Sequence, residues 1–175
     1  MILESITETS SEFLQLEGIE YFRFEEDFME NNMRCIPMII RFKMDKAGIK
    51  LKLSEWKRLS TEERIELALM NCNNSQEAKQ YSSYLAGLVK KYTGREATIL
   101  KVDQNPLWCN VYSLPEILNE KLTESGWHLP IEQWKGLTNL QRFALLKLCR
   151  PGHENKNFPK AIKEFQLLTD NNVFA

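Results

Sequence analysis

The sequence is poor in the residues that usually build metal and catalytic centres. Its only histidines are His128 and His153, and its four cysteines lie far apart without a Cys-x-x-Cys pair. Cys149-x-x-x-His153 has the spacing of half a zinc site, but a structural zinc ion normally takes a second close pair of ligands. We therefore expect neither a metal site nor a bound cofactor.

Several familiar motifs are also absent. The chain has no GxxxxGK[ST], no GxGxxG, no GxSxG and no HExxH, which argues against the common phosphate-binding, hydrolase and metalloprotease sites. Its 23 basic and 24 acidic residues give a formal charge of -1. Such a balance does not suggest a nucleic-acid-binding protein.

Long hydrophobic stretches are missing as well. The first residues, MILESITETSSEF, lack the basic start and the apolar run of a secretory signal. No stretch approaches the roughly 18 apolar residues of a transmembrane helix. We expect a cytoplasmic protein with reduced thiols and no membrane partner.

What the sequence does contain is enough apolar material for a core and an internal repeat. Hydrophobic residues make up 43% of the chain, which is typical of a globular fold. Residues 36–67 align without a gap on residues 114–145, at a constant shift of 78. Ten of the 32 aligned positions are identical: Pro37/Pro115, Ile39/Ile117, Lys43/Lys121, Gly48/Gly126, Leu51/Leu129, Trp56/Trp134, Lys57/Lys135, Leu59/Leu137, Arg64/Arg142 and Leu67/Leu145. Two copies of one supersecondary unit explain this agreement.

Each copy predicts the same series of elements. A helix starts near Pro37 or Pro115, with Ser113 offering a capping box to the second, and ends at Gly48 or Gly126. A short extended piece follows, and the two pieces pairing as a small β-ribbon is an open alternative. A one-turn helix around the tryptophan then leads to helices at 61–71 and 139–149 that begin with capping boxes. Arg64 and Arg142, eight residues after Trp56 and Trp134, are expected to stack on them.

The remaining segments complete a mainly α fold. We expect a linking helix over 75–92, a connection over 95–113, a last helix over 159–168 and a short strand over 19–24. The two repeats, about 36–72 and 114–150, are predicted to pack as pseudo-symmetric halves of one domain over 19–175. Residues 1–18 are interpreted as an N-terminal extension.

The stretch RPGHENKNF, residues 150–158, holds the strongest candidates for chemistry. His153 is the side chain most suited to act as a base near neutral pH. Its neighbour Glu154 is poorly placed to orient it. The alternative is structural: His153, Asn155 and Asn157 bond to the backbone, and Asn157 caps the last helix. We favour the structural interpretation.

Cys35 is the candidate nucleophile. It stands before a predicted helix N-terminus and beside Arg34, and both favour a thiolate. The alternative is a cysteine that packs as a small hydrophobic side chain, which we consider the better interpretation.

Four motifs together resemble the conserved nitrate reductase-associated protein family. They are FEEDF at 24–28, RCIPM at 34–38, GIKLKL at 48–53 with Trp56, and LTxxQRF at 137–143 with RPxHENxNF at 150–158. The resemblance runs from about Phe22 to Phe165, so residues 1–18 lie outside the common core. It makes the residues that match the motifs candidates for a partner surface or for the fold: Arg34, Cys35, Pro37, His153, Glu154, Asn155 and Asn157.

The resemblance implies an accessory role in nitrate assimilation. Members are similar to a protein needed for an active assimilatory nitrate reductase, an enzyme that itself carries a molybdenum cofactor and an iron–sulfur cluster. The family has no catalytic activity or catalytic residues assigned. We therefore expect a non-catalytic accessory or maturation factor with nitrate reductase as its protein partner. A small enzyme or a ligand-binding regulatory protein that uses Cys35 or His153 is the alternative.

Overall fold

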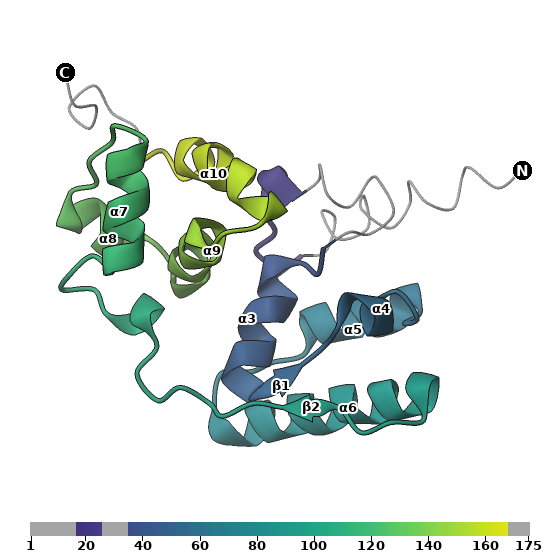
Figure 1. Ribbon diagram of the computed structural model, residues 1–175. Helices are drawn as coiled ribbons and strands as arrows, with labels where there is room; N and C mark the ends of the chain where they lie inside the picture. Colours follow the sequence, from purple (N-terminus) through teal and green to yellow (C-terminus); the bar gives the residue numbers. More distant parts are fainter. Residues whose placement is uncertain (1–16, 26–34, 168–175) are drawn as a thin grey trace, which may run out of the picture. The chain divides into compact units, whose positions relative to one another are not determined.

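The computed structural model describes residues 17–25 and 35–167, except for the side chains of His153 and Glu154. Predictions for Arg34, for most of the N-terminal extension and for the end of the FEEDF run lie outside these residues. The described chain is mainly helical, as predicted (Figure 1). It divides into two compact units, one ending at Asp103 and the other beginning at Gln104. That they form one domain stays a prediction.

The first unit, unit 1, contains most of the helical length and a two-stranded sheet. Its elements are η1 (Arg23–Glu25), α3 (Met38–Ala47), β1 (Ile49–Lys50), α4 (Leu53–Trp56), α5 (Thr61–Leu69), α6 (Ser75–Thr93) and β2 (Thr98–Ile99). The linking helix was thus predicted almost to the residue. Helix α3 packs on α6, and the strands lie across α6 (Figure 1). Fully buried Ile40, Trp56, Leu67, Tyr81 and Leu85 form the centre of its core.

The second unit, unit 2, is built around one buried helix. Its elements are η2 (Leu107–Cys109), α7 (Glu116–Glu124), α8 (Ile131–Gly136), α9 (Asn139–Cys149), η3 (His153–Asn157) and α10 (Phe158–Glu164). Helix α9 matches the predicted range, and η2, α7, η3 and α10 all pack against it. Its residues from Arg142 to Leu146 are all buried.

Capping residues set several helix ends where the sequence places them. Ser60 with Glu63 and Thr138 with Gln141 form capping boxes that start α5 and α9. Gly48 ends α3 at φ 65°, and its N–H donates to the carbonyl of Met44. Gly126 follows α7 at φ 70°, and two overlapping backbone bonds close that end.

Three details of the prediction were wrong. Ser113 forms no capping box, because α7 begins at Glu116 and the Ser113 hydroxyl instead accepts from the Asn110 amide. The helix starts near Pro37 and Pro115 are confirmed, since these prolines occupy the N-cap positions, one residue before each helix. The predicted strand at 19–24 is replaced by the 3-10 turn η1, closed by the Glu25 N–H on the Phe22 carbonyl.

The last helix is the third of these details, because it ends at Glu164 instead of residue 168. Gln166 adopts φ 56°, the left-handed region in which few residues other than glycine lie. The Gln166 and Leu167 N–H groups then donate to Lys163 and Ile162. The residue with positive φ in this bonding pattern is usually glycine. Because residue 166 is a glutamine, no signal in the sequence marked a helix end here.

The small sheet forms, but with a different partner from the one considered. Strand β1 pairs antiparallel with β2, with Ile49 opposite Ile99, and not with the corresponding piece of the second copy. The chain leaves α6 at Gly94 and returns past β1, where the Leu100 N–H donates to the Gly48 carbonyl at 2.8 Å. The partner of β1 is therefore β2, which is closer in sequence than the extended piece of the second copy.

Candidate functional site

Glu25, in the FEEDF motif, binds the first backbone N–H of α3. This buried carboxylate accepts the Met38 N–H at 2.6 Å and the Phe22 N–H at 3.3 Å. Pro37 is buried beside it, while Cys35 is half-buried. In the sequence, FEEDF stood out only as a family-like motif, and no role was assigned to Glu25. The available signal was a helix whose first N–H groups follow a proline and need an acceptor.

The position of Glu25 bears on Cys35 as a nucleophile. A helix N-terminus activates a thiol by stabilising negative charge. Here the Glu25 carboxylate already accepts the first N–H of α3. The negative charge that this helix end stabilises is therefore that of Glu25. The geometry therefore favours a structural Cys35.

The loop 150–158 forms the 3-10 helix η3 and leads directly into α10. Asn157 is buried and occupies the N-cap position of α10, as predicted, but its side chain makes no capping bond there. The next residue, Phe158, is fully buried and stacks on Trp127 at 6.4 Å. The backbone of His153 and Glu154 belongs to η3. Cys35 and this loop belong to different compact units, so each is described by itself.

The predicted stacking of arginine on tryptophan is observed in unit 1. The Arg64 guanidinium lies 5.2 Å from the centre of the Trp56 ring. Its Nε and Nη2 donate to the Trp56 carbonyl at 3.3 and 3.2 Å, and Nη2 also reaches the Lys57 carbonyl. Burial lowers the pKa of the Arg64 guanidinium. The arginine thus ties the start of α5 to the end of α4.

In unit 2 the corresponding arginine, Arg142, bonds to more segments of the chain than Arg64 does. Arg142 lies 5.7 Å from the Trp134 ring. Its guanidinium donates to the carbonyls of Trp134, Lys135 and Leu137, to the Asn139 side chain, and to the Trp108 carbonyl at 2.8 Å. Trp134 Nε1 adds a bond to the Asn110 carbonyl at 2.8 Å. These matched contacts agree with the sequence repeat at particular positions, but the repeat as a whole stays a prediction.

Lys43 is a feature that sequence reasoning missed beyond its place in the repeat. Its Nζ donates to the Ala68 and Met70 carbonyls at 2.5 and 2.7 Å, at the end of α5. Cys72 lies nearby, and its thiol donates to the Lys43 carbonyl at 3.6 Å. Burial lowers the pKa of Lys43 to about 8 and raises that of the Cys72 thiol. A protonated thiol is a poor nucleophile, so this cluster serves mainly to cap α5.

The cysteines differ in their access to solvent. Cys72 and Cys149 are buried, and burial raises the pKa of Cys149 to about 12. Cys109 is exposed and Cys35 half-buried. Within residues 17–25 and 35–167, no three His, Cys, Asp or Glu side chains converge as metal ligands do. No helix in the same ranges combines the length and apolarity needed to cross a bilayer.

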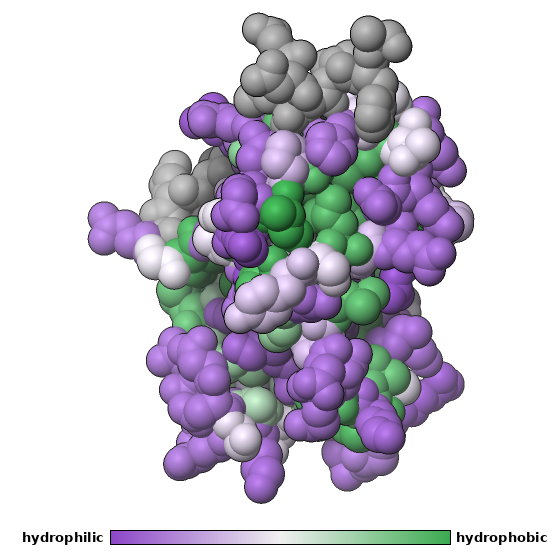
Figure 2. All heavy atoms as spheres, turned by 90° about the vertical axis from the view of Figure 1, so that its left-hand side faces the viewer, coloured by the Kyte–Doolittle hydropathy of each residue, from purple (hydrophilic) through white to green (hydrophobic). Residues whose placement is uncertain are grey.

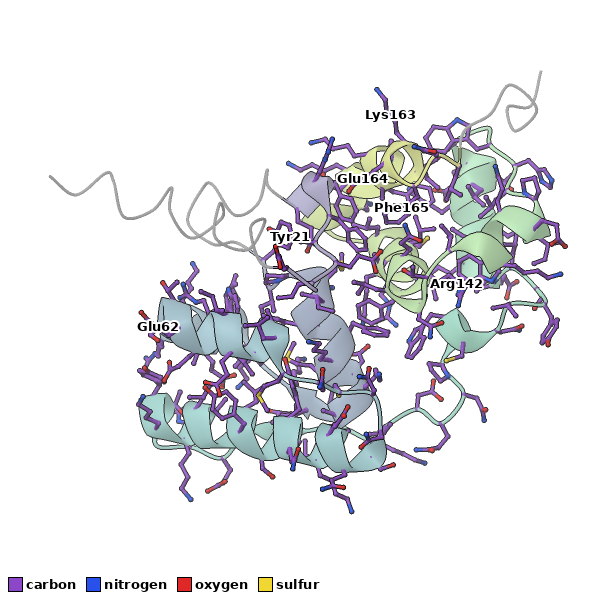
Figure 3. The ribbon with its side chains drawn as sticks, turned by 180° about the vertical axis from the view of Figure 1, so that it is seen from behind. Tyr21, Glu62, Arg142, Lys163, Glu164 and Phe165 are labelled. Carbon is purple, nitrogen blue, oxygen red and sulfur yellow. The ribbon has the colours of Figure 1, made fainter. Side chains whose placement is uncertain are left out.

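The outer face of α5 carries a groove of about 500 Å³. It is lined by Glu62, Ile65, Glu66, Leu69, Met70 and Asn71. Leu69 is 50% exposed, one of few large hydrophobic residues so exposed in the described chain. Figure 3 shows Glu62 on α5 at the surface of unit 1. Figure 2 shows, on another side of the molecule, hydrophobic side chains reaching the surface between hydrophilic ones.

One comparison with known proteins gives a match. The model of the family described as conserved nitrate reductase-associated protein matches residues 21–165. No curated protein matches the chain, and no solved structure does.

Proposed function

The chain belongs to the conserved nitrate reductase-associated protein family, and from this premise we propose that it is a non-catalytic accessory or maturation factor for assimilatory nitrate reductase. It acts by binding the enzyme, in the cytoplasm, and either assists insertion of the reductase's cofactors or holds a conformation that can receive them. The family match over residues 21–165 is the observation that carries this proposal.

The geometry of the motif residues supports a binding protein. The motif carboxylate Glu25 caps α3, and the motif residues Trp56 and Arg142 lie in bonded, buried clusters. These groups maintain a largely preformed surface, which lowers the entropy lost on binding. The enzyme alternative receives less support, since Glu25 already occupies the helix end that would activate Cys35.

The exposed part of the C-terminal motif is a candidate partner surface within this proposal. Asn157 and Phe158 are buried and fix the start of α10. Pro151, Gly152 and Lys156 are exposed around them. His153, Glu154 and Asn155 are thus proposed to contribute to binding through a loop that the buried residues hold in place.

The test is a deletion in cells grown on nitrate as the sole nitrogen source. We expect lower nitrate reductase activity, lower molybdenum and iron per molecule of reductase, and recovery of both when the full chain is restored. A tagged chain should also co-purify with the reductase. Unchanged activity and unchanged metal content in the deletion strain would overturn the proposal.

A further inference from the structure

The groove on α5 becomes informative when α5 is compared with α9. The two helices begin 78 residues apart with the same type of capping box. Three positions of α9 that correspond to the groove, Leu140, Phe143 and Ala144, are at most 5% exposed. Their counterparts in α5 are Glu62, Ile65 and Glu66, of which both glutamates are exposed. These three positions are therefore buried in α9, whereas two of them are exposed in α5.

Unit 2 shows what kind of element packs against such a helix. Helix α10 packs against α9 and buries Phe158, Ala161 and Ile162, which have the i, i+3, i+4 spacing of an amphipathic helix. Its lysines, Lys160 and Lys163, remain exposed, and Lys163 points outward in Figure 3. A short amphipathic helix is thus one of the elements that pack against α9, and its lysines lie on its exposed face.

The charges around the groove select a basic occupant. Glu62 and Glu66 are four residues apart and flank Ile65 and Leu69 on the same face. The neighbouring Glu63 is instead paired with Lys91 at 2.8 Å. Glu66 accepts the Tyr84 hydroxyl at 2.6 Å and stays exposed. Lys43 reaches the Met70 carbonyl, so the positive charge lies at the opposite end of the groove from Glu62.

We propose that this groove is the docking site for a short amphipathic helix of nitrate reductase, with apolar residues at i, i+3 and i+4 and lysine or arginine facing Glu62 and Glu66. Apolar side chains enter between Ile65 and Leu69, and the basic residues meet the two carboxylates. This is the helix-in-groove mode of recognition. Docking of one short helix fits the weak, transient association that an accessory factor requires. The inference rests on the proposed function.

The test measures binding of the purified full-length chain to purified nitrate reductase, for the wild type and two groove variants. Leu69→Asp places a charge in the apolar part and should weaken binding at least about tenfold. Glu62→Lys reverses a charge and should weaken it several-fold at low salt and less at high salt. Both sites are exposed, and thermal unfolding checks that each variant folds.

Two matched controls lie outside the groove. Leu107→Asp makes the same change at a leucine that is 56% exposed. Glu116→Lys reverses another exposed glutamate in the first turn of a helix. Both controls should bind within about twofold of the wild type, because neither residue lines the groove.

The outcomes separate the two proposals. If the wild type binds the reductase and both groove variants bind equally well, the groove is not the docking site and the proposed function stands. If the wild type does not bind the reductase, both proposals fail. Overlapping peptides of the reductase then identify the segment in the positive case. A best-binding peptide without basic residues or without the i, i+3, i+4 apolar spacing would overturn the assigned occupant.

Discussion

Arg64 and Arg142 stand 78 residues apart and lie over tryptophans eight residues before them, yet they hold different amounts of chain. Arg64 bonds to two carbonyls at the junction of α4 and α5. Arg142 bonds to the corresponding junction and also to Leu137, Asn139 and Trp108. The Trp108 contact joins α9 to a segment 34 residues earlier. One sequence pattern thus supplies a local tie in unit 1 and a longer-range tie in unit 2.

The largest expected effect comes from removing the two arginines. Arg142→Met should lower the free energy of unfolding by about 3 to 5 kcal/mol, and Arg64→Met by about 2 kcal/mol, because more buried carbonyls lose their donor in unit 2. Urea unfolding followed by circular dichroism measures both. Lysine at either position should recover little, since one ammonium cannot reach several carbonyls. Equal losses at the two positions would contradict the comparison.

The two matched glycines should differ next. Both have positive φ, so alanine costs about 1 to 2 kcal/mol at Gly126 from the backbone alone. At Gly48 a Cβ would also lie 2.7 Å from the Leu100 carbonyl oxygen and 2.8 Å from Val102 Cγ2. Gly48→Ala should therefore cost roughly 3 kcal/mol in the same unfolding experiment.

Asparagine separates the two causes at these glycines. It tolerates positive φ better than alanine does. Gly126→Asn should therefore be milder than Gly126→Ala, whereas Gly48→Asn should remain severe. A mild Gly48→Asn variant would show that the close approach of Leu100 and Val102 does not matter.

The tryptophans provide a smaller contrast. Trp134 Nε1 donates to the Asn110 carbonyl, whereas Trp56 Nε1, also buried, has no hydrogen-bond partner among the residues described. Both Trp→Phe changes leave a similar volume empty, but only Trp134→Phe removes a donor from a carbonyl. Trp134→Phe should therefore be the more destabilising by about 1 to 2 kcal/mol in thermal or urea unfolding. The reverse order would contradict these bonding patterns.

The last contrast concerns the pH dependence of stability at Lys43 and Lys121. Burial lowers the pKa of Lys43 from its ordinary 10.5 to about 8. Between these values the unfolded chain keeps a proton that the folded chain has released, so rising pH favours the folded state. Stability of the wild type relative to Lys43→Met should thus increase from about pH 8 to 10.5 and be constant below that window.

The comparison with Lys43→Met also controls for other groups. Burial raises the pKa of the Cys72 thiol, which makes the absolute stability fall above its ordinary pKa of 9.0. Taking the difference between two proteins that share Cys72 removes most of that opposing trend. Lys121→Met, where the lysine pairs with Glu124 at the surface, controls for loss of a lysine charge. A flat difference curve for Lys43 would contradict its buried position.

Local signals in the sequence predicted the helices well. Capping boxes at Ser60 and Thr138 and the glycines at 48 and 126 fix helix ends through bonds within a few residues. Contacts between distant segments were not predictable in the same way. The Glu25 bond to Met38, the pairing of β1 with β2 and the Lys43 bonds to α5 depend on how the chain folds back. No spacing rule encodes those approaches.

For the candidate site too, the sequence revealed local motifs but not features that depend on the folded structure. Sequence motifs pointed to Cys35 and to residues 150–158, and within the second stretch Asn157 and Phe158 are buried. The groove on α5 carries no motif. It is recognised only when Glu62, Ile65 and Glu66 are compared with the buried positions Leu140, Phe143 and Ala144 of α9.

Glu62 and Glu66 also affect how copies of this protein meet one another. A symmetric dimer through the α5 face would bring four carboxylates, two from each copy, into one interface. Like charges brought together at an interface disfavour association. The two exposed glutamates that line the groove therefore disfavour a dimer through this face.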